Sequence, residues 1–235
     1  MTVTGSLVQT LHRINRQKAD INAQLQRGPK LVAASESKLK TAEDHVLATK
    51  DKLTKAKMAA HAKQLQMSER EQKIRSWQGK MNAAKENREY QALKDQIAAD
   101  TQANLVLSDE ILDLLESIDA LGVELKEAEA DVKTKQSEFA QVQKQVTDRR
   151  MVLESELSRV QAELDKAEAE LSGDVRRDYL KLVSSKGDDG MAELDGKCCG
   201  GCYQSLTPAL LDRLTMNQSI ACPSCGRLVY QNFDR

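Results

Sequence analysis

The sequence predicts a mainly α-helical protein: a long antiparallel coiled-coil helical hairpin followed by a small C-terminal β-rich module with a short helix. Three observations predict this fold class. Aromatic residues make up 3% of the 235 residues and charged residues 30%, so few large side chains are available to fill the core of a compact enzyme. Apolar residues recur every seven positions along two long segments. Two pairs of cysteines lie close together near the C-terminus.

The first long segment has an apolar residue at every seventh position from Leu11 to Met81, with Lys18 the one exception among eleven positions. A second set, offset by three residues, begins with Ile14 but becomes polar in its middle, for example at Thr49. A seven-residue apolar repeat of this length is typical of a coiled-coil helix. The polar middle predicts a narrow, partly hydrated seam between the helices.

A second apolar repeat runs from Tyr90 to Ala167, and Asn104 is its only clearly polar member. The two repeats lose phase between Met81 and Tyr90, so we expect the chain to reverse near residues 82–88. Asn87 could cap the second helix, because Asn is favoured just before a helix begins.

Charge also favours a hairpin within one chain. Residues 1–85 have a net charge of +10, whereas residues 86–172 have a net charge of −11. An antiparallel hairpin places these opposite charges side by side, whereas a parallel homodimer would place like charges together. We therefore expect a coiled-coil hairpin over residues 1–172, kinked near residues 28–29 by Gly28 and Pro29.

Residues 173–190 are expected to form a short helix, around residues 174–183, and a turn-rich linker before the module at 191–235. In the module, Asp195 and Gly196 are typical of a tight β-hairpin turn. Thr207 and Pro208 predict the start of a short helix. Strands are expected at 218–221 and 227–230.

The cysteines carry the most specific signal in the sequence. Cys199 and Cys202 form one C-x-x-C pair, and Cys222 and Cys225 form another nineteen residues later. Two such knuckles can supply four thiolates to one tetrahedral zinc ion. Because sulfur would occupy all four positions, we expect one structural Zn²⁺ rather than a catalytic one. Cys198 is adjacent to a ligand but does not fit either pair.

Other chemistries of these cysteines are less favoured. The N-terminus lacks a secretion signal and no apolar run is long enough for a membrane span, so a soluble cytoplasmic protein is expected and disulfides are not. A thioredoxin-like redox pair would need a surrounding βαβ unit, and the sequence predicts none around these cysteines. A rubredoxin-like iron site stays an alternative, although this segment has few aromatic residues to surround it.

With these residues in place, the chain resembles the bacterial C4-type zinc-ribbon coiled-coil family over nearly its whole length. The resemblance lies in segments 87–93 (NREYQAL), 111–116 (ILDLLE) and 226–230 (GRLVY), and in the two knuckles. It implies the four cysteine ligands and a nucleic-acid-binding or regulatory adaptor function, with protein partners in transcription, motility or secretion. Cys198 lies outside the family pattern.

The charge balance gives only weak support for nucleic-acid binding, because residues 173–235 contain eight basic and eight acidic side chains and a four-thiolate zinc site adds about −2. Candidate contacts to a partner or a nucleic acid are the basic and tyrosine side chains near the cysteines: Arg176, Arg177, Lys181, Tyr203, Arg213, Arg227 and Tyr230. The alternative for each of them is a solvated charge or a ring of the core. At the hairpin tip, beside Asn87, Trp77 and Tyr90 are expected to form an aromatic pair. This pair closes the coil or contacts a partner.

We expect no enzymatic activity. The sequence lacks a phosphate-binding loop, an H-E-x-x-H motif and a nucleophile elbow, and its three histidines (His12, His45 and His61) are dispersed along one helix. The favoured function is a regulatory adaptor that binds a transcription-related protein, a nucleic acid or both. A purely structural spacer is the alternative, and the oligomeric state stays open, with a monomer among the options.

Overall fold

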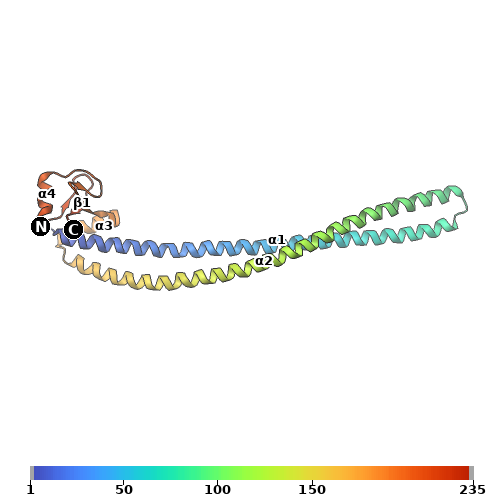
Figure 1. Cartoon of the computed structure of the whole chain (residues 1–235), viewed down its shortest axis with the longest axis horizontal. Coiled ribbons are helices and arrows are strands. Elements are labelled where there is room, and N and C mark those ends of the chain that lie inside the picture. The colour runs from blue at the N-terminus through green and yellow to red at the C-terminus, as the bar shows by residue number, and fades with distance from the viewer. Residues whose placement is uncertain (1–2, 233–235) are drawn as a thin grey trace. The chain divides into compact units, whose positions relative to one another are not determined.

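The computed structural model describes residues 3–232, so residues 1–2 and 233–235 of the predicted hairpin and module lie outside it. Two long antiparallel helices and a small sheet confirm the predicted fold class (Figure 1). Helix α1 spans Gly5–Ala83 and helix α2 spans Asn87–Ala169. The described chain divides into two compact units. We call residues 34–141 the tip unit, and residues 3–33 together with 142–232 the ribbon unit.

The chain reverses at residues 84–86, within the range that the sequence predicted. Asn87 is the first residue of α2. The preceding residue, Glu86, supplies the carbonyl that accepts a hydrogen bond from the Tyr90 N–H at 3.1 Å. Asn87 therefore lies inside the helix and does not precede it as a cap.

Charged side chains cross between α1 and α2 in the tip unit. Lys63 Nζ lies 2.5 Å from Glu110 Oε2, and Lys50 Nζ lies 2.9 Å from Glu129 Oε1. In each pair the basic partner comes from α1 and the acidic partner from α2, as the charge division of the sequence predicted. Exposed pairs of this kind contribute about 0 to 1 kcal/mol each, so they select the antiparallel register more than they stabilise it.

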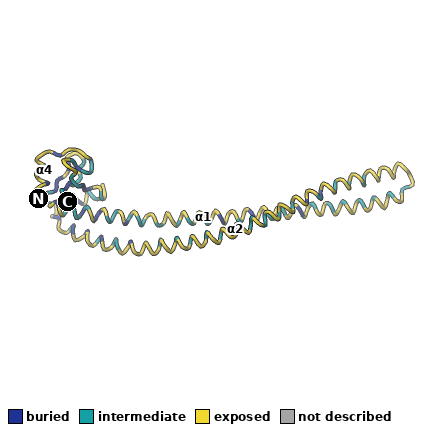
Figure 2. The backbone as a smooth tube through the Cα atoms, viewed as in Figure 1, coloured by how far each residue is buried: buried dark blue, intermediate teal, exposed yellow. Residues whose placement is uncertain are grey.

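The heptad positions form the seam between the helices in both units. Every position of the first repeat from Leu11 to Met81 is buried or half-buried, and so is every position of the second repeat from Ile97 to Ala167 (Figure 2). The predicted polar middle is present: Thr49 is fully buried, and its hydroxyl donates to Glu124 Oε1 at 3.2 Å.

Helix α1 continues without a break through Pro29, and the predicted kink there stays a prediction. Gly28 has a packing role instead. A Cβ atom at Gly28 would lie 2.9 Å from Val146 Cγ1 of α2, which is closer than carbon atoms approach without repulsion. Glycine at this position lets the two helices approach each other closely.

Helix α3 (Gly173–Lys186) extends three residues beyond the range expected for it, and a single 3₁₀ turn (Gly187–Gly190) forms the rest of the predicted turn-rich linker. Tyr179 of α3 is almost completely buried against the apolar side chains of α1 and α2. The Lys186 ammonium donates to the Cys225 carbonyl at 2.5 Å. The segment after the hairpin is therefore packed into the ribbon unit and does not act as a free linker.

The sheet has the strand order β2-β1-β4-β3. Strands β1 (Met191–Asp195) and β2 (Cys198–Cys199) form the predicted hairpin, and Gly196 has the positive φ of 59° that its turn needs. Strand β4 (Leu228–Tyr230) pairs in parallel with β1 and antiparallel with β3 (Ile220–Ala221). The parallel pair joins the start of the module to its end.

Residues 3–5 are hydrogen-bonded to the C-terminal module, a contact that the sequence did not predict. Thr4 forms an antiparallel bridge with Gln218. The Gly5 N–H donates to the Asn217 carbonyl at 2.8 Å, and the Ser219 N–H donates to the Val3 carbonyl at 2.9 Å. The ribbon is thereby hydrogen-bonded to the first turn of α1. Within residues 3–232, no helix has a stretch apolar enough to cross a membrane.

Candidate metal centre

Four cysteine sulfurs converge in the ribbon unit. The Sγ atoms of Cys199, Cys202, Cys222 and Cys225 all lie within 4.8 Å of one another. Cys199 Sγ is 3.9 Å from Cys225 Sγ, and Cys202 Sγ is 3.7 Å from Cys222 Sγ. The two C-x-x-C pairs, nineteen residues apart in the sequence, therefore form one cluster, as predicted.

The spacing fits a tetrahedral metal ion. Four sulfurs that each lie about 2.3 Å from a central zinc ion are about 3.8 Å from one another. A disulfide would instead require a separation of about 2.05 Å, and all five cysteines are free thiols. The cluster could therefore hold a metal ion, and its four donors would fill a tetrahedral coordination shell.

Backbone hydrogen bonds shape both knuckles. The Tyr203 N–H donates to the Cys199 carbonyl at 2.7 Å, and the Gly226 N–H donates to the Cys222 carbonyl at 2.9 Å. Tyr203 and Gly226 thus occupy the same position, directly after the second cysteine of each pair. Both have a positive φ, 59° at Tyr203 and 72° at Gly226, a conformation that glycine adopts easily and tyrosine does not.

Close approach explains the glycines of the first knuckle. A Cβ atom at Gly200 would collide with the Glu193 carbonyl of β1, which instead accepts a hydrogen bond from the Gly200 N–H at 3.0 Å. A Cβ atom at Gly201 would collide with the side chain of Arg227. The two knuckles are therefore packed against each other and against the sheet.

Arg227 places a cation beside the cluster. Its Nε donates to the Asp189 carbonyl at 2.6 Å, which holds the guanidinium beside the knuckles. Burial raises the pKa of the Cys225 thiol, but hydrogen bonds from the backbone and side chain of Arg227, together with those from Cys202 and Cys222, outweigh it and lower this pKa to about 6. Cys225 therefore ionises more easily than Cys199, whose thiol pKa is raised by burial, and thiolate is the form that coordinates metals.

Cys198 does not belong to the cluster. It lies on β2 opposite Asp195, and its Sγ is 3.7 Å from the Ser205 hydroxyl. It is absent from the group of cysteines that can share one metal ion. The geometry agrees with the expectation that Cys198 is not a ligand.

The predicted contact residues differ widely in accessibility. Tyr203 is 72% exposed, whereas Tyr230 is only 6% exposed. The Tyr230 hydroxyl lies 3.0 Å from His12 Nδ1 of α1, and the two rings meet edge to face with centroids 5.7 Å apart. Tyr230 is therefore a core ring and is not accessible for stacking on a ligand, because its ring fills the interface between β4 and α1.

Apart from Arg227, the predicted basic contacts lie on two helices of the ribbon unit. Arg176 and Lys181 are exposed on α3, where Arg177 forms an ion pair with Asp174. On α4 (Pro208–Thr215), Arg213 Nε lies 3.4 Å from Gln218 Oε1. Thr207 precedes α4, as predicted, but its side chain makes no capping hydrogen bond.

The aromatic pair expected at the hairpin tip does not form. The ring contact present among residues 3–232 joins His12 and Tyr230, not Trp77 and Tyr90. The register explains this difference. The contact between Lys63 and Glu110 places Trp77 at the level of residue 96, about one and a half helical turns from Tyr90. Trp77 is half-buried in the seam, and Tyr90 is exposed.

A buried polar contact joins α3 to α1, and sequence reasoning missed it. Asn15 Nδ2 donates to the Tyr179 hydroxyl at 2.8 Å and to the Leu11 carbonyl at 2.8 Å. Asn15 directly follows Ile14 of the apolar repeat, so the repeat predicts that Asn15 lies on the polar, exposed face of the helix. Its burial differs from that expectation. With the His12 to Tyr230 contact, it fixes α3 and the sheet against α1.

No protein-family model and no curated protein sequence matches the chain. Similar folds occur among solved structures. CT398 from Chlamydia trachomatis has a TM-score of 0.80 and 14% identity, with 97% of this chain and 98% of that chain covered. HP0958 from Helicobacter pylori has a TM-score of 0.67 and 13% identity, with the same coverage of 97% and 98%. A protein from Mycobacterium smegmatis has a TM-score of 0.58 and 18% identity, with 99% and 100% covered. At these identities the likeness establishes a shared fold over nearly the whole chain.

Proposed function

We propose that the protein is a non-enzymatic adaptor in which a zinc-stabilised ribbon, held on a coiled-coil hairpin, presents a binding surface to a macromolecule. Tyr203 is the single observation that carries this proposal. Its side chain is 72% exposed although its backbone has a φ of 59°. This conformation costs a non-glycine residue about 1 to 2 kcal/mol. An exposed aromatic side chain in a strained position is better explained by contact with a partner than by folding.

Zinc is the metal that best suits the cluster. Two of the four cysteines, Cys199 and Cys222, are buried, and the other two are half-buried. Sulfur donors at all four positions leave no place for a metal-bound water, so the ion would be structural. Iron in a rubredoxin-like site is the alternative, and absorption of visible light by the purified protein would identify it.

A protein partner is favoured over a nucleic acid. The charges of residues 173–235 balance, and the zinc site would add about −2. The burial of Tyr230 leaves Tyr203 as the exposed ring on the described part of the sheet and knuckles. The resemblance to C4-type zinc-ribbon coiled-coil proteins, which the hairpin and the cysteine cluster support, suggests a cytoplasmic partner in transcription, motility or secretion.

The test compares two exposed tyrosines. The full-length protein and its Tyr203→Gly and Tyr90→Phe variants would be used for affinity purification with mass spectrometry, with and without nuclease. We expect Tyr203→Gly to retain its metal, to be as stable as the wild type or more stable, and to lose the bound protein. Tyr90→Phe should retain it. Equal recovery with wild type and Tyr203→Gly would contradict binding through the knuckle.

Nuclease treatment separates the two partner classes. Proteins that remain after digestion are direct partners, whereas their loss would indicate a bridging nucleic acid. Filter binding of RNA and DNA over a range of salt is the direct measurement. Binding that weakens steeply with salt would favour a nucleic acid, and no retention at low salt would exclude it as a ligand.

A further inference from the structure

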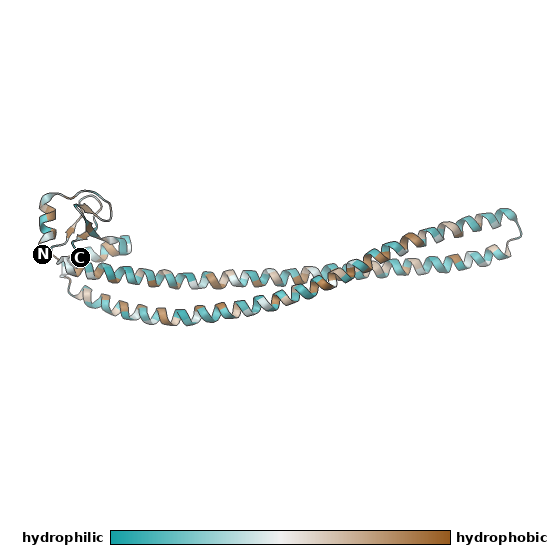
Figure 3. Ribbon diagram, viewed as in Figure 1, coloured by the Kyte–Doolittle hydropathy of each residue, from teal (hydrophilic) through white to brown (hydrophobic). Residues whose placement is uncertain are grey.

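Helix α2 has an apolar stripe on its outer surface in the tip unit. Leu105, Leu112 and Leu115 are exposed, and Leu112 is 56% exposed. Their spacings of seven and three residues place them on one face of a supercoiled helix. Ile111 is buried in the seam, so this face is separate from the contact with α1. Figure 3 shows hydrophobic residues concentrated in this part of α2.

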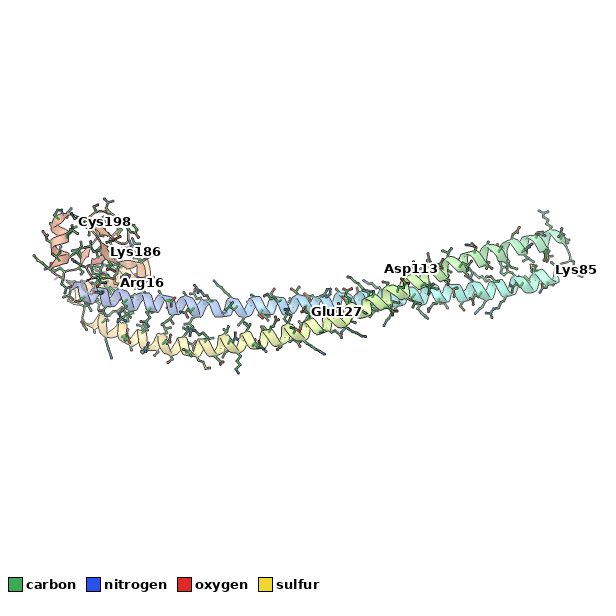
Figure 4. The ribbon with its side chains drawn as sticks, viewed as in Figure 1. Arg16, Lys85, Asp113, Glu127, Lys186 and Cys198 are labelled. Atoms are coloured by element: carbon green, nitrogen blue, oxygen red, sulfur yellow. The ribbon has the colours of Figure 1, made fainter. Side chains whose placement is uncertain are left out.

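Acidic side chains surround this stripe. From residue 95 to residue 125 the sequence contains no lysine or arginine. Asp113, which is marked in Figure 4, and Glu116 are exposed. In the part of the chain that the structure describes, neither carboxylate forms an ion pair, although Glu110 in the same segment does. The stripe therefore lies in a surplus of negative charge of which α1 neutralises only a part.

Helix α1 has a complementary stripe on its outer surface. Leu47, Met58 and Leu65 are exposed, and Met58 is 68% exposed. Their separations of eleven and seven residues place them on adjoining positions of the heptad. Lys57 is exposed beside Met58 and forms no ion pair among the described residues. This surface is basic and apolar, as a partner for the stripe on α2 would have to be.

The two stripes lie at the same level along the tip unit and reach the same side of it. The contact between Lys63 and Glu110 places Met58 at the level of Leu115. The contact between Lys50 and Glu129 marks one side of the helix pair. Lys57 follows Lys50 by one heptad and Leu115 precedes Glu129 by two, so both residues flank that same side.

We propose that this side of the tip unit binds a second copy of the chain, forming a four-helix bundle between two hairpins. A two-fold axis along the hairpin keeps each residue at its level and places α1 of one copy on α2 of the other. Leu112 and Leu115 then pack near Met58 of the second copy, and Glu116 faces its Lys57. A two-fold axis across the hairpin would place basic α1 on basic α1, which charge disfavours.

Sedimentation of the full-length protein over a wide concentration range tests the proposal. We expect a monomer–dimer equilibrium for the wild type. Leu115→Glu should raise the dissociation constant of the dimer at least about tenfold. Val106→Glu is the matched control, because Val106 is exposed on the same helix but outside the stripe. Thermal unfolding of each variant shows whether the hairpin itself is intact. A wild type that stays monomeric, or equal effects of the two substitutions, would overturn the proposal.

Charge reversal tests the orientation of the two copies. Lys57→Glu and Glu116→Lys should each weaken the dimer, and the double variant should recover at least part of the lost affinity. In a mixture of isotopically labelled and unlabelled protein, a zero-length carbodiimide reagent should crosslink Lys57 to Glu116 between copies. Crosslinks joining α1 only to α1 would refute the arrangement, and dimerisation that survives Leu115→Glu would place the interface elsewhere.

Discussion

Replacement of one cysteine of the cluster should unfold the ribbon and leave the hairpin intact. Cys222→Ser is the sharpest change, because Cys222 is buried and its Sγ is 3.7 Å from that of Cys202. Serine keeps the approximate size of the side chain, but its hydroxyl is a poor ligand at a site where sulfur binds the metal. Cys198→Ser is the matched control, since Cys198 is next to the cluster but outside it.

The expected magnitude follows from the size of the module. Structural zinc contributes roughly 10 to 16 kcal/mol of coupled binding and folding in small zinc domains, whereas a whole domain is stable by about 5 to 15 kcal/mol. The apolar cluster under the knuckles contains only a few medium-sized side chains, such as Leu206, Leu214 and Val229. Loss of one ligand should therefore exceed what this core can supply.

The assay combines three measurements on the full chain. Elemental analysis should find one zinc per chain in the wild type and in Cys198→Ser, and none in Cys222→Ser. Helices α3 and α4 have 14 and 8 residues beside 79 and 83 in α1 and α2, so circular dichroism should lose only about a tenth of its helical signal. Hydrogen exchange should accelerate at the Gly226 amide and remain slow in the tip unit.

A metal-free Cys222→Ser protein that keeps the Gly226 amide protected would refute this reasoning, because the ribbon would then fold by burial alone. Collapse of the helical signal would refute it in the other direction. It would mean that the hairpin needs the ribbon, to which α1 is bound through Gly5 and Asn217.

Three further predictions concern polar groups that are buried or half-buried. Tyr179→Phe should lower the free energy of unfolding by about 1 to 3 kcal/mol in urea titrations, because it leaves the buried Asn15 amide with one partner fewer; no change would mean that water replaces the hydroxyl. Asn104→Ile should raise the melting temperature, because the buried Asn104 Oδ1 has no hydrogen-bond partner among the described residues; a lower melting temperature would contradict this. Burial and then Arg16 lower the pKa of His12, so the unfolded state takes up a proton first as the pH falls. Stability relative to His12→Gln should be constant above neutral pH and decrease below about 6.5, and an increase there would contradict the shift.

The sequence alone determined the helices, their antiparallel pairing and the four cysteines. These features depend on local spacing and on the net charge of each half of the hairpin. A seven-residue repeat marks the buried side of a helix wherever its partner lies, and the opposite charges of the two halves leave one favourable pairing. A C-x-x-C knuckle brings two sulfurs together through its own turn. The positive φ of Tyr203 could also have been predicted, since Tyr203 occupies the position that Gly226 has in the second knuckle.

Only the tertiary structure decided which of the remaining side chains are accessible. Tyr230 has an aromatic ring of the kind that stacks on a ligand, yet this ring is buried against His12, 218 residues away in the chain. Thr4 pairs with Gln218, and Gly28 packs closely against Val146 of the opposite helix. Such contacts cannot be predicted from the sequence around either residue, because burial depends on which surfaces meet after the chain has folded.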